Sequence, residues 1–164
     1  MQDWITYGAV ILLIVLTTYL YQRQKLKVKK FILAKMYYSF GRVEIVILKQ
    51  SSVIKSLIIR THLKENANFD KKDYYLEIKK NDDDKILLNF SDNEILNSLS
   101  DLKANQLSIK FSEFKTFLNS FEIEKKNKKF RFIIKHQAFQ SIKTPYLALN
   151  QRWSLYVPDS GKYN

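Results

Sequence analysis

The side chains of this chain that could do chemistry are few and widely spaced. Asp82, Asp83 and Asp84 form its densest acidic cluster, and carboxylate oxygens are ligands for hard cations. The glycine and the distal glutamate of an EF-hand loop are missing, so we interpret the cluster as a solvated hairpin tip. His62 and His136 are the two imidazoles, and zinc binding or acid–base catalysis by either needs carboxylates that the fold must supply. Each lies in or beside a basic stretch, which is typical of surface histidines.

The composition excludes several kinds of active site. The absence of cysteine excludes disulfides, thiol catalysis and cysteine-bound metals. The chain has three glycines, and its sequence contains no phosphate loop, dinucleotide motif or serine nucleophile elbow. We therefore predict no catalytic residue, no metal site and no cofactor, and we expect a protein that is not an enzyme.

Basic and aromatic residues alternate between residues 125 and 135. Binders of single-stranded nucleic acid use this combination, because bases stack on the rings and phosphates meet the cations. In a strand, however, Phe130 and Phe132 lie on one face and Arg131 on the other, which more often indicates a core face and a solvated face. Nucleic acid, lipid headgroups and an acidic partner all remain open as contacts for this segment.

The strongest pattern in the sequence is the run from Trp4 to Tyr21, which contains no charged side chain. A helix over this run is about 27 Å long, close to the roughly 30 Å of a bilayer's hydrocarbon core. A cleaved signal peptide is disfavoured, because Asp3 is the only early charge and no small-residue cleavage site follows. We predict a transmembrane anchor over residues 1–22. The expected membrane-anchoring residues are Trp4, Tyr7, Leu12, Leu13, Leu16, Tyr19 and Tyr21.

The distribution of charge predicts the orientation of this anchor. All 28 lysines and arginines follow Gln22, and the net charge is +12. The positive-inside rule places the N-terminus outside and the C-terminal domain in the cytoplasm of a bacterium, or in the matrix or stroma of an organelle. Basic side chains beside a bilayer attract anionic headgroups. The residues predicted to contact anionic lipid or a partner are Arg23, Lys25, Lys27, Lys29, Lys30, Lys125, Lys126, Lys128, Lys129 and Arg131.

Two further regions follow the anchor. Residues 23–41 are predicted to form a basic juxtamembrane stalk, in which apolar residues at helical spacing continue the first helix as far as Gly41. Residues 42–164 are predicted to form one basic soluble domain. The C-terminal segment carries Trp153, Tyr156 and Tyr163, and because such segments fray unless they are held, we predict partner contacts for these three rings.

The domain pattern mixes strands and helices without regular alternation. It predicts a covered strand over 43–48, hairpins pairing 74–79 with 85–90 and 122–124 with 130–134, and a strand over 107–111. It also predicts helices after the capping box at 91–94, from Ser112, and from Pro145, while residues 51–62 fit a helix or a strand. This pattern indicates an α+β domain with a largely antiparallel sheet.

These features favour a non-catalytic, single-pass accessory or structural subunit of a membrane protein complex. Its expected partners are the membrane, other membrane-protein subunits and anionic lipid headgroups. A membrane-tethered module that binds nucleic acid or a ribosome is the first alternative, and an enzyme that acts on a membrane-bound substrate is the second.

Overall fold

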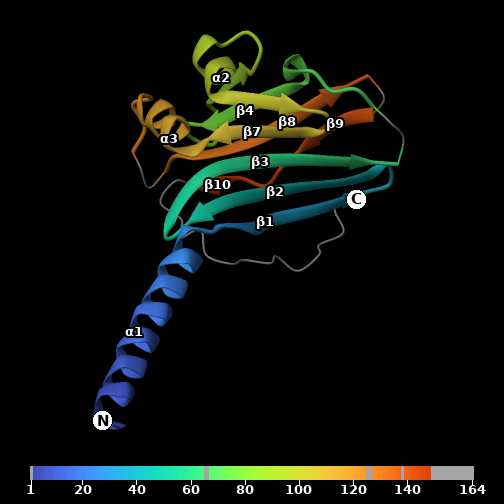
Figure 1. The fold of residues 1–164 in the computed structure, drawn as a ribbon. Helices are drawn as coiled ribbons and strands as arrows, with labels where there is room; N and C mark the ends of the chain where they lie inside the picture. Colours follow the sequence, from blue (N-terminus) through green and yellow to red (C-terminus); the bar gives the residue numbers. More distant parts are fainter. Residues whose placement is uncertain (1, 65–66, 125–126, 138, 149–164) are drawn as a thin grey trace.

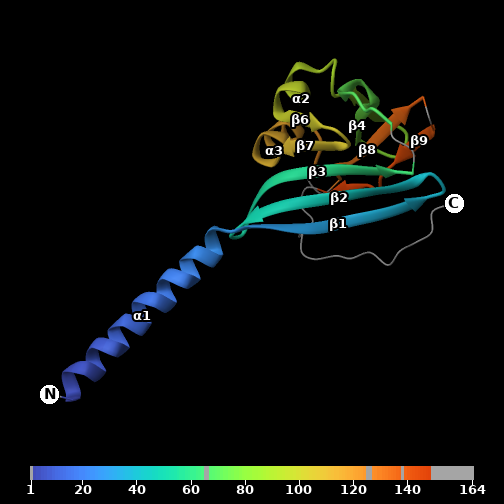
Figure 2. The ribbon, with the colours of Figure 1, turned by 45° about the vertical axis from the view of Figure 1, so that its right-hand side comes forward.

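A long helix projects from one end of a domain built on two β-sheets (Figure 1). The computed structural model describes residues 2–64, 67–124, 127–137 and 139–148. Helix α1 (Gln2–Leu26) is long and apolar enough to cross a membrane, and none of its apolar window is buried against the domain. Figure 2 shows the same separation after a 45° turn. The predicted helix is therefore present, and the domain covers no part of its apolar window.

The two sheets are antiparallel throughout the described residues. The first has the strand order β1-β2-β3-β7-β6, and the second has the order β10-β8-β4-β5, with β9 also paired to β8. The strands of the first sheet are β1 (Val28–Tyr38), β2 (Gly41–Gln50), β3 (Val53–Leu63), β6 (Ser100–Lys103) and β7 (Gln106–Lys110). Those of the second are β4 (Tyr74–Lys79), β5 (Lys85–Asn89), β8 (Lys129–His136), β9 (Phe139–Lys143) and β10 (Leu147–Ala148).

One hydrophobic core lies between the sheets. Alternate residues of β2, among them Ile45 and Ile47, share this core with Leu76 and Ile78 of β4. Helices α2 (Glu94–Leu99) and α3 (Phe111–Asn119) complete it at one end, where Phe114 packs edge-on against Phe130 with ring centroids 5.4 Å apart. The predicted α+β domain with a mostly antiparallel arrangement of strands is thus confirmed.

The helical stalk predicted after the anchor is wrong. Helix α1 ends at Leu26, and β1 begins at Val28 and pairs with β2 along its whole length. A β-bulge between Ile32 and Ala34 shifts the register of that pairing. Gly41, predicted as a helix stop, instead closes the tight β1–β2 turn with φ at +151°. Helix α1 therefore leads directly into the sheet.

Other predicted elements divide into two groups. The covered strand at 43–48 and the hairpin of β4 with β5 are confirmed, and residues 53–63 form a strand. Helix α2 is confirmed, although its N-cap is Asn93, whose side chain accepts a hydrogen bond from the Leu96 amide at 3.0 Å. Residues 122–124 form no strand, because β8 pairs with β4, β9 and β10 instead. Leu147 and Ala148 lie in β10, so the helix predicted from Pro145 is wrong over the described residues.

Candidate functional site

The helix and the sheet are joined by direct hydrogen bonds at the end of α1. Only Lys27 separates α1 from β1. The side-chain Nε2 of Gln50 donates to the Leu26 carbonyl at 2.9 Å, and the Ser51 hydroxyl donates to the Lys25 carbonyl at 3.1 Å. Both donors come from the β2–β3 turn and its approach, and they satisfy carbonyls that a helix C-terminus leaves without intrahelical partners. The β2–β3 turn therefore holds the domain against the end of the helix.

The structure brings half of the predicted basic residues together at this junction. Arg23, Lys25, Lys27, Lys29 and Lys30 are all exposed over the last turn of α1 and the start of β1. No acidic residue interrupts the sequence between them, so this part of the surface carries a concentrated positive charge. These five residues fit the predicted contact with anionic lipid or a partner.

The remaining predicted contact residues have different surroundings. Lys128 is buried, and its ammonium donates to the Leu118 and Phe121 carbonyls at 2.7 and 2.9 Å, so it caps the end of α3 rather than extending a basic surface. Arg131 is half-buried and bonded to Glu77, whereas Lys129 is exposed. The other predicted contacts, Lys125, Lys126, Trp153, Tyr156 and Tyr163, lie outside the described residues.

The aromatic residues of β8 do not form a surface for stacking bases. Phe130 and Phe132 are fully buried in the core between the sheets. Base stacking requires an exposed ring face. The alternation in this segment therefore places Phe130 and Phe132 on a core face and Arg131 on the opposite, more accessible face.

A buried carboxylate lies among three basic side chains on the face of the first sheet opposite to the core. Glu44, flanked in sequence by the core residues Val43 and Ile45, is only 4% exposed. Its oxygens lie 3.1 Å from Arg42 Nε, 3.5 Å from His62 Nε2 and 3.8 Å from Lys35 Nζ. The cluster places one predicted histidine beside a carboxylate, and the other two groups around Glu44 are the side chains of Arg42 and Lys35.

His136 lies in a different environment from His62. Its Nε2 is 3.0 Å from the Asn68 carbonyl oxygen, and its ring stacks on Phe139 with centroids 5.4 Å apart. Phe69 packs against the same imidazole at 5.0 Å. These contacts join β8 and β9 to the loop before β4, and none of them involves a carboxylate.

A second polar cluster joins β4, β8 and the segment before β10. The Glu77 carboxylate accepts hydrogen bonds from Arg131 Nε at 2.8 Å and from the Tyr146 hydroxyl at 2.5 Å. The Arg131 guanidinium also lies over the Tyr146 ring, 4.5 Å from its centroid. Burial alone would raise the pKa of Glu77, but the hydrogen bonds from Tyr146 and Arg131 and the nearby positive charges lower it below its ordinary value of 4.5. With Glu77 ionised, the cluster therefore stabilises the packing of β4, β8 and the segment before β10.

We expect Glu77→Gln to lower the free energy of unfolding at neutral pH by ~1–3 kcal/mol, because it leaves Arg131 without its charged partner. A carboxyl group whose pKa is lower in the folded state stabilises the fold above its ordinary pKa of 4.5, and that contribution is lost as the pH falls through the folded-state pKa. The wild type should therefore lose stability below pH 4.5, while Glu77→Gln should show a weaker dependence there. Denaturant unfolding between pH 3 and pH 7 measures this, with Glu122→Gln, at an exposed carboxylate, as the control. Equal pH dependence in all three proteins would contradict the assignment.

Asp82, Asp83 and Asp84 are exposed in the turn between β4 and β5, which confirms the predicted hairpin tip. Asp82 lies 2.8 Å from Lys79 Nζ, and Asp84 lies 3.7 Å from Lys80 Nζ, in the β4–β5 connection. The hydrogen bond and the charge of Lys79 lower the pKa of Asp82. Within the described residues, no group of three or more acidic or histidine side chains is arranged to hold a metal ion.

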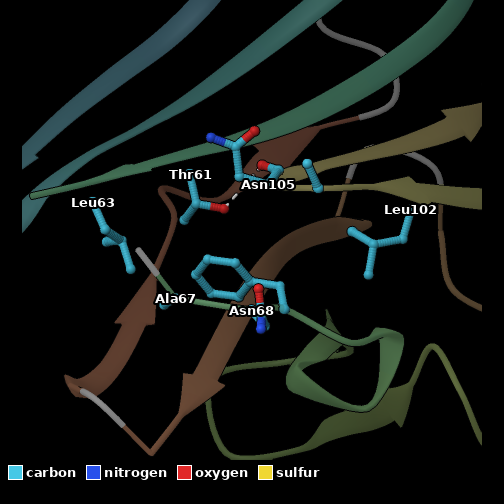
Figure 3. A pocket seen from close by; sticks show the side chains of 8 residues that line it. Thr61, Leu63, Ala67, Asn68, Leu102 and Asn105 are labelled. Atoms are coloured by element: carbon cyan, nitrogen blue, oxygen red, sulfur yellow. Dashed lines mark hydrogen bonds between the residues drawn. The ribbon is translucent and has the colours of Figure 1, made fainter. Parts of the chain in front are cut away.

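A cavity of about 600 Å³, seen from close by in Figure 3, lies at the end of β3 that is farther from α1 (Figure 1). Thr61 occupies its wall, donating to the Asn105 carbonyl at 3.1 Å and lying 3.2 Å from the Tyr74 hydroxyl. Burial raises the pKa of Tyr74 to about 12, so this phenol stays neutral at physiological pH. The described lining is uncharged and suits a small neutral group rather than acid–base chemistry. The lining residues are Thr61, Leu63, Ala67, Asn68, Phe69, Leu102, Ala104 and Asn105.

Several residues that define these sites carry weak signals in the sequence. Glu44 is the one charged residue between Val43 and Leu48, and a charge within such an apolar run indicates a partner. Ser51 and Gln50 have no signal, because their hydrogen bonds join segments that are distant in sequence. Comparison with known protein families, with curated protein sequences and with solved structures gives no match.

Proposed function

We propose that this chain is a non-catalytic, single-pass subunit of a membrane protein complex, with its basic domain on the cytoplasmic or matrix face. The exposure of α1 is the observation that carries the proposal. From Asp3 to Leu26 every side chain of this helix is exposed, including large apolar ones such as Leu12 and Ile11. An apolar surface of this size is stable only when lipid or other helices cover it.

The junction supports a retained anchor rather than a removable leader. The carbonyls of Lys25 and Leu26 are capped by Ser51 and Gln50 of the domain, and the single residue Lys27 leads into β1. Removal of α1 would take away these capped carbonyls and leave both donors without their partners. The helix end is thus integrated into the fold of the domain.

The basic junction supports the orientation with the domain inside. Arg23, Lys25, Lys27, Lys29 and Lys30 lie at the domain end of α1, whereas the other end carries Asp3 as its only charged side chain. This asymmetry is the one that the positive-inside rule describes. A non-catalytic role is supported by the separate surroundings of the two histidines, because His62 lies beside Glu44 whereas His136 lies beside the Asn68 carbonyl.

Isolation of the tagged chain from its native membrane in a mild detergent tests the proposal. We expect co-elution of other membrane subunits in fixed stoichiometry, and we expect His62→Ala, His136→Ala and Asp83→Asn to leave assembly and activity per complex unchanged. In sealed vesicles with the cytoplasmic or matrix face outward, added protease should remove the domain. Elution of the chain alone would contradict the subunit role. A histidine variant that assembles normally but abolishes activity would require a catalytic role instead.

A further inference from the structure

A hollow with a volume of about 500 Å³ lies where α1 meets the β2–β3 turn. Its walls come from the last turns of the helix, from the start of β1 and from the turn, so neither the helix nor the sheet forms it alone. The residues that line it are Tyr21, Gln24, Lys25, Lys27, Lys29, Ser51 and Ser52.

The lining of this hollow is chemically suited to a phosphate group. Three lysine ammonium groups line it, and none of the described lining residues is acidic. Ser52 adds a neutral hydroxyl side chain beside the charges, whereas the Ser51 hydroxyl already donates to the Lys25 carbonyl. Lysines bind phosphate as point charges, and hydroxyls complete the contacts to its oxygens.

The Lys25 side chain has a defined place in this arrangement. Its Nζ lies 4.6 Å from the centroid of the Tyr21 ring, one helical turn earlier. A cation over an aromatic face is held by the ring quadrupole, which limits the freedom of a side chain that is otherwise mobile. The ring and the ammonium thus form one wall together.

The end of a helix would ordinarily repel an anion, because its last carbonyls carry partial negative charge. Here Ser51 donates to the Lys25 carbonyl at 3.1 Å and the Gln50 amide donates to the Leu26 carbonyl at 2.9 Å. These hydrogen bonds satisfy two of the carbonyls nearest to the hollow. The positive charge of the lysines therefore dominates the local field.

The depth of the hollow selects the source of the phosphate. The uncharged run of α1 ends at Tyr21, which is also the first residue of the lining. With the run spanning about 27 Å of a hydrocarbon core of roughly 30 Å, the hollow begins in the headgroup layer. Tyrosine favours that layer, because its ring is apolar and its hydroxyl is polar.

We infer that this hollow binds the phosphate of an anionic phospholipid headgroup. The inference rests on the proposed membrane anchoring and adds a discrete, saturable site to it. Lys27 and Lys29 supply charge from the sheet side, and Lys25 supplies it from the helix side. A bound headgroup would connect α1 to the β2–β3 turn and fix the domain at one height above the bilayer.

Titration of the purified full-length chain in a neutral detergent tests this site. The probes are dioctanoyl phosphatidylglycerol, dioctanoyl phosphatidylcholine and inorganic phosphate, and native mass spectrometry measures the bound fraction. We expect one phosphatidylglycerol to bind at least tenfold more tightly than either other probe. The double variant Lys27→Gln/Lys29→Gln should weaken that binding about 25-fold at low salt. Lys64→Gln/Lys72→Gln removes the same charge from exposed positions away from the hollow and should change the affinity less than twofold.

Three outcomes would overturn the inference. Equal affinity for the two lipids would show that the hollow does not recognise the anionic headgroup. Equal weakening by the two double variants would show that net charge, and not this site, attracts the lipid. Equal affinity for inorganic phosphate would identify a free anion as the ligand. Carbonate extraction of the wild-type chain separates this inference from the proposed function. Release of the chain into the supernatant contradicts the anchor itself. Retention of a chain that shows no lipid selectivity in the titration contradicts only the lipid site.

Discussion

Leu13→Arg is expected to abolish stable membrane integration of the chain. Leu13 lies near the middle of the uncharged run and is exposed on a helix that the domain does not cover. A guanidinium near the bilayer centre costs about 2.5–3.5 kcal/mol on insertion scales, which shifts the insertion equilibrium roughly 100-fold. Alkaline carbonate extraction of membranes, followed by quantification of the chain in pellet and supernatant, measures the effect.

Leu26→Arg provides the matched control for this experiment. It makes the same substitution in the same exposed helix, but at the basic end, where an arginine reaches the headgroup layer. We expect Leu26→Arg to stay in the carbonate-resistant pellet like the wild type. If Leu13→Arg is retained equally well, then α1 is not the anchor, and the proposed single-pass subunit loses its main support.

Gly41→Ala is expected to destabilise the domain by about 3 kcal/mol or more. The backbone of Gly41 has φ at +151°, a region that side chains rarely adopt. A Cβ at this position would lie 2.2 Å from the His62 carbonyl oxygen and 2.8 Å from the Leu63 Cα. Both are backbone atoms of the neighbouring strand, so relief requires separation of β2 from β3. Denaturant unfolding followed by near-ultraviolet circular dichroism should show a clearly lower midpoint.

Gly8→Ala is the control for this substitution. Gly8 lies in α1, and a Cβ there would meet no atom within 4 Å. We expect its unfolding midpoint to equal that of the wild type, which would assign the effect to the β1–β2 turn rather than to the loss of a glycine. Unchanged stability of Gly41→Ala would mean that the close approach of β2 and β3 at this turn is wrong.

The sequence predicted the N-terminal helix and the covered strand at 43–48 well, because each has an unbroken local pattern. It failed for β1, and the bulge between Ile32 and Ala34 explains the failure. A bulge inserts an extra residue, so the apolar positions that follow it no longer keep strict alternation with those before it. Phe31 and Ala34, on either side of the bulge, are therefore three positions apart, a spacing that also occurs on one face of a helix, although the backbone is extended.

The pairing of β8 and the junction hollow could not be predicted for a different reason. The strand β8 pairs with β4, although β5, α2, β6, β7 and α3 lie between them in the sequence. Lys128 is buried because its ammonium donates to two carbonyls at the end of α3. Nothing local distinguishes this lysine from the exposed Lys129. The basic half of the hollow was visible as a charge run, but Ser51 and Ser52 reach it only through the β2–β3 turn.

With α1 in a bilayer, as proposed above, the one-residue connection between α1 and β1 would couple the tilt of the helix to the position of the sheet. The strand β3 begins beside the junction of α1 with the β2–β3 turn. It extends over 11 residues, about 33 Å at the rise of a strand, to the cavity that Thr61 and Leu63 line. Transmembrane helices tilt over a range of tens of degrees as bilayer thickness and neighbouring helices change. With the hydrogen bonds of Gln50 and Ser51 intact, a tilt of about 10° moves the far end of β3 by roughly 6 Å. In the proposed arrangement, a change in bilayer thickness that tilts α1 would therefore shift the outer end of the domain.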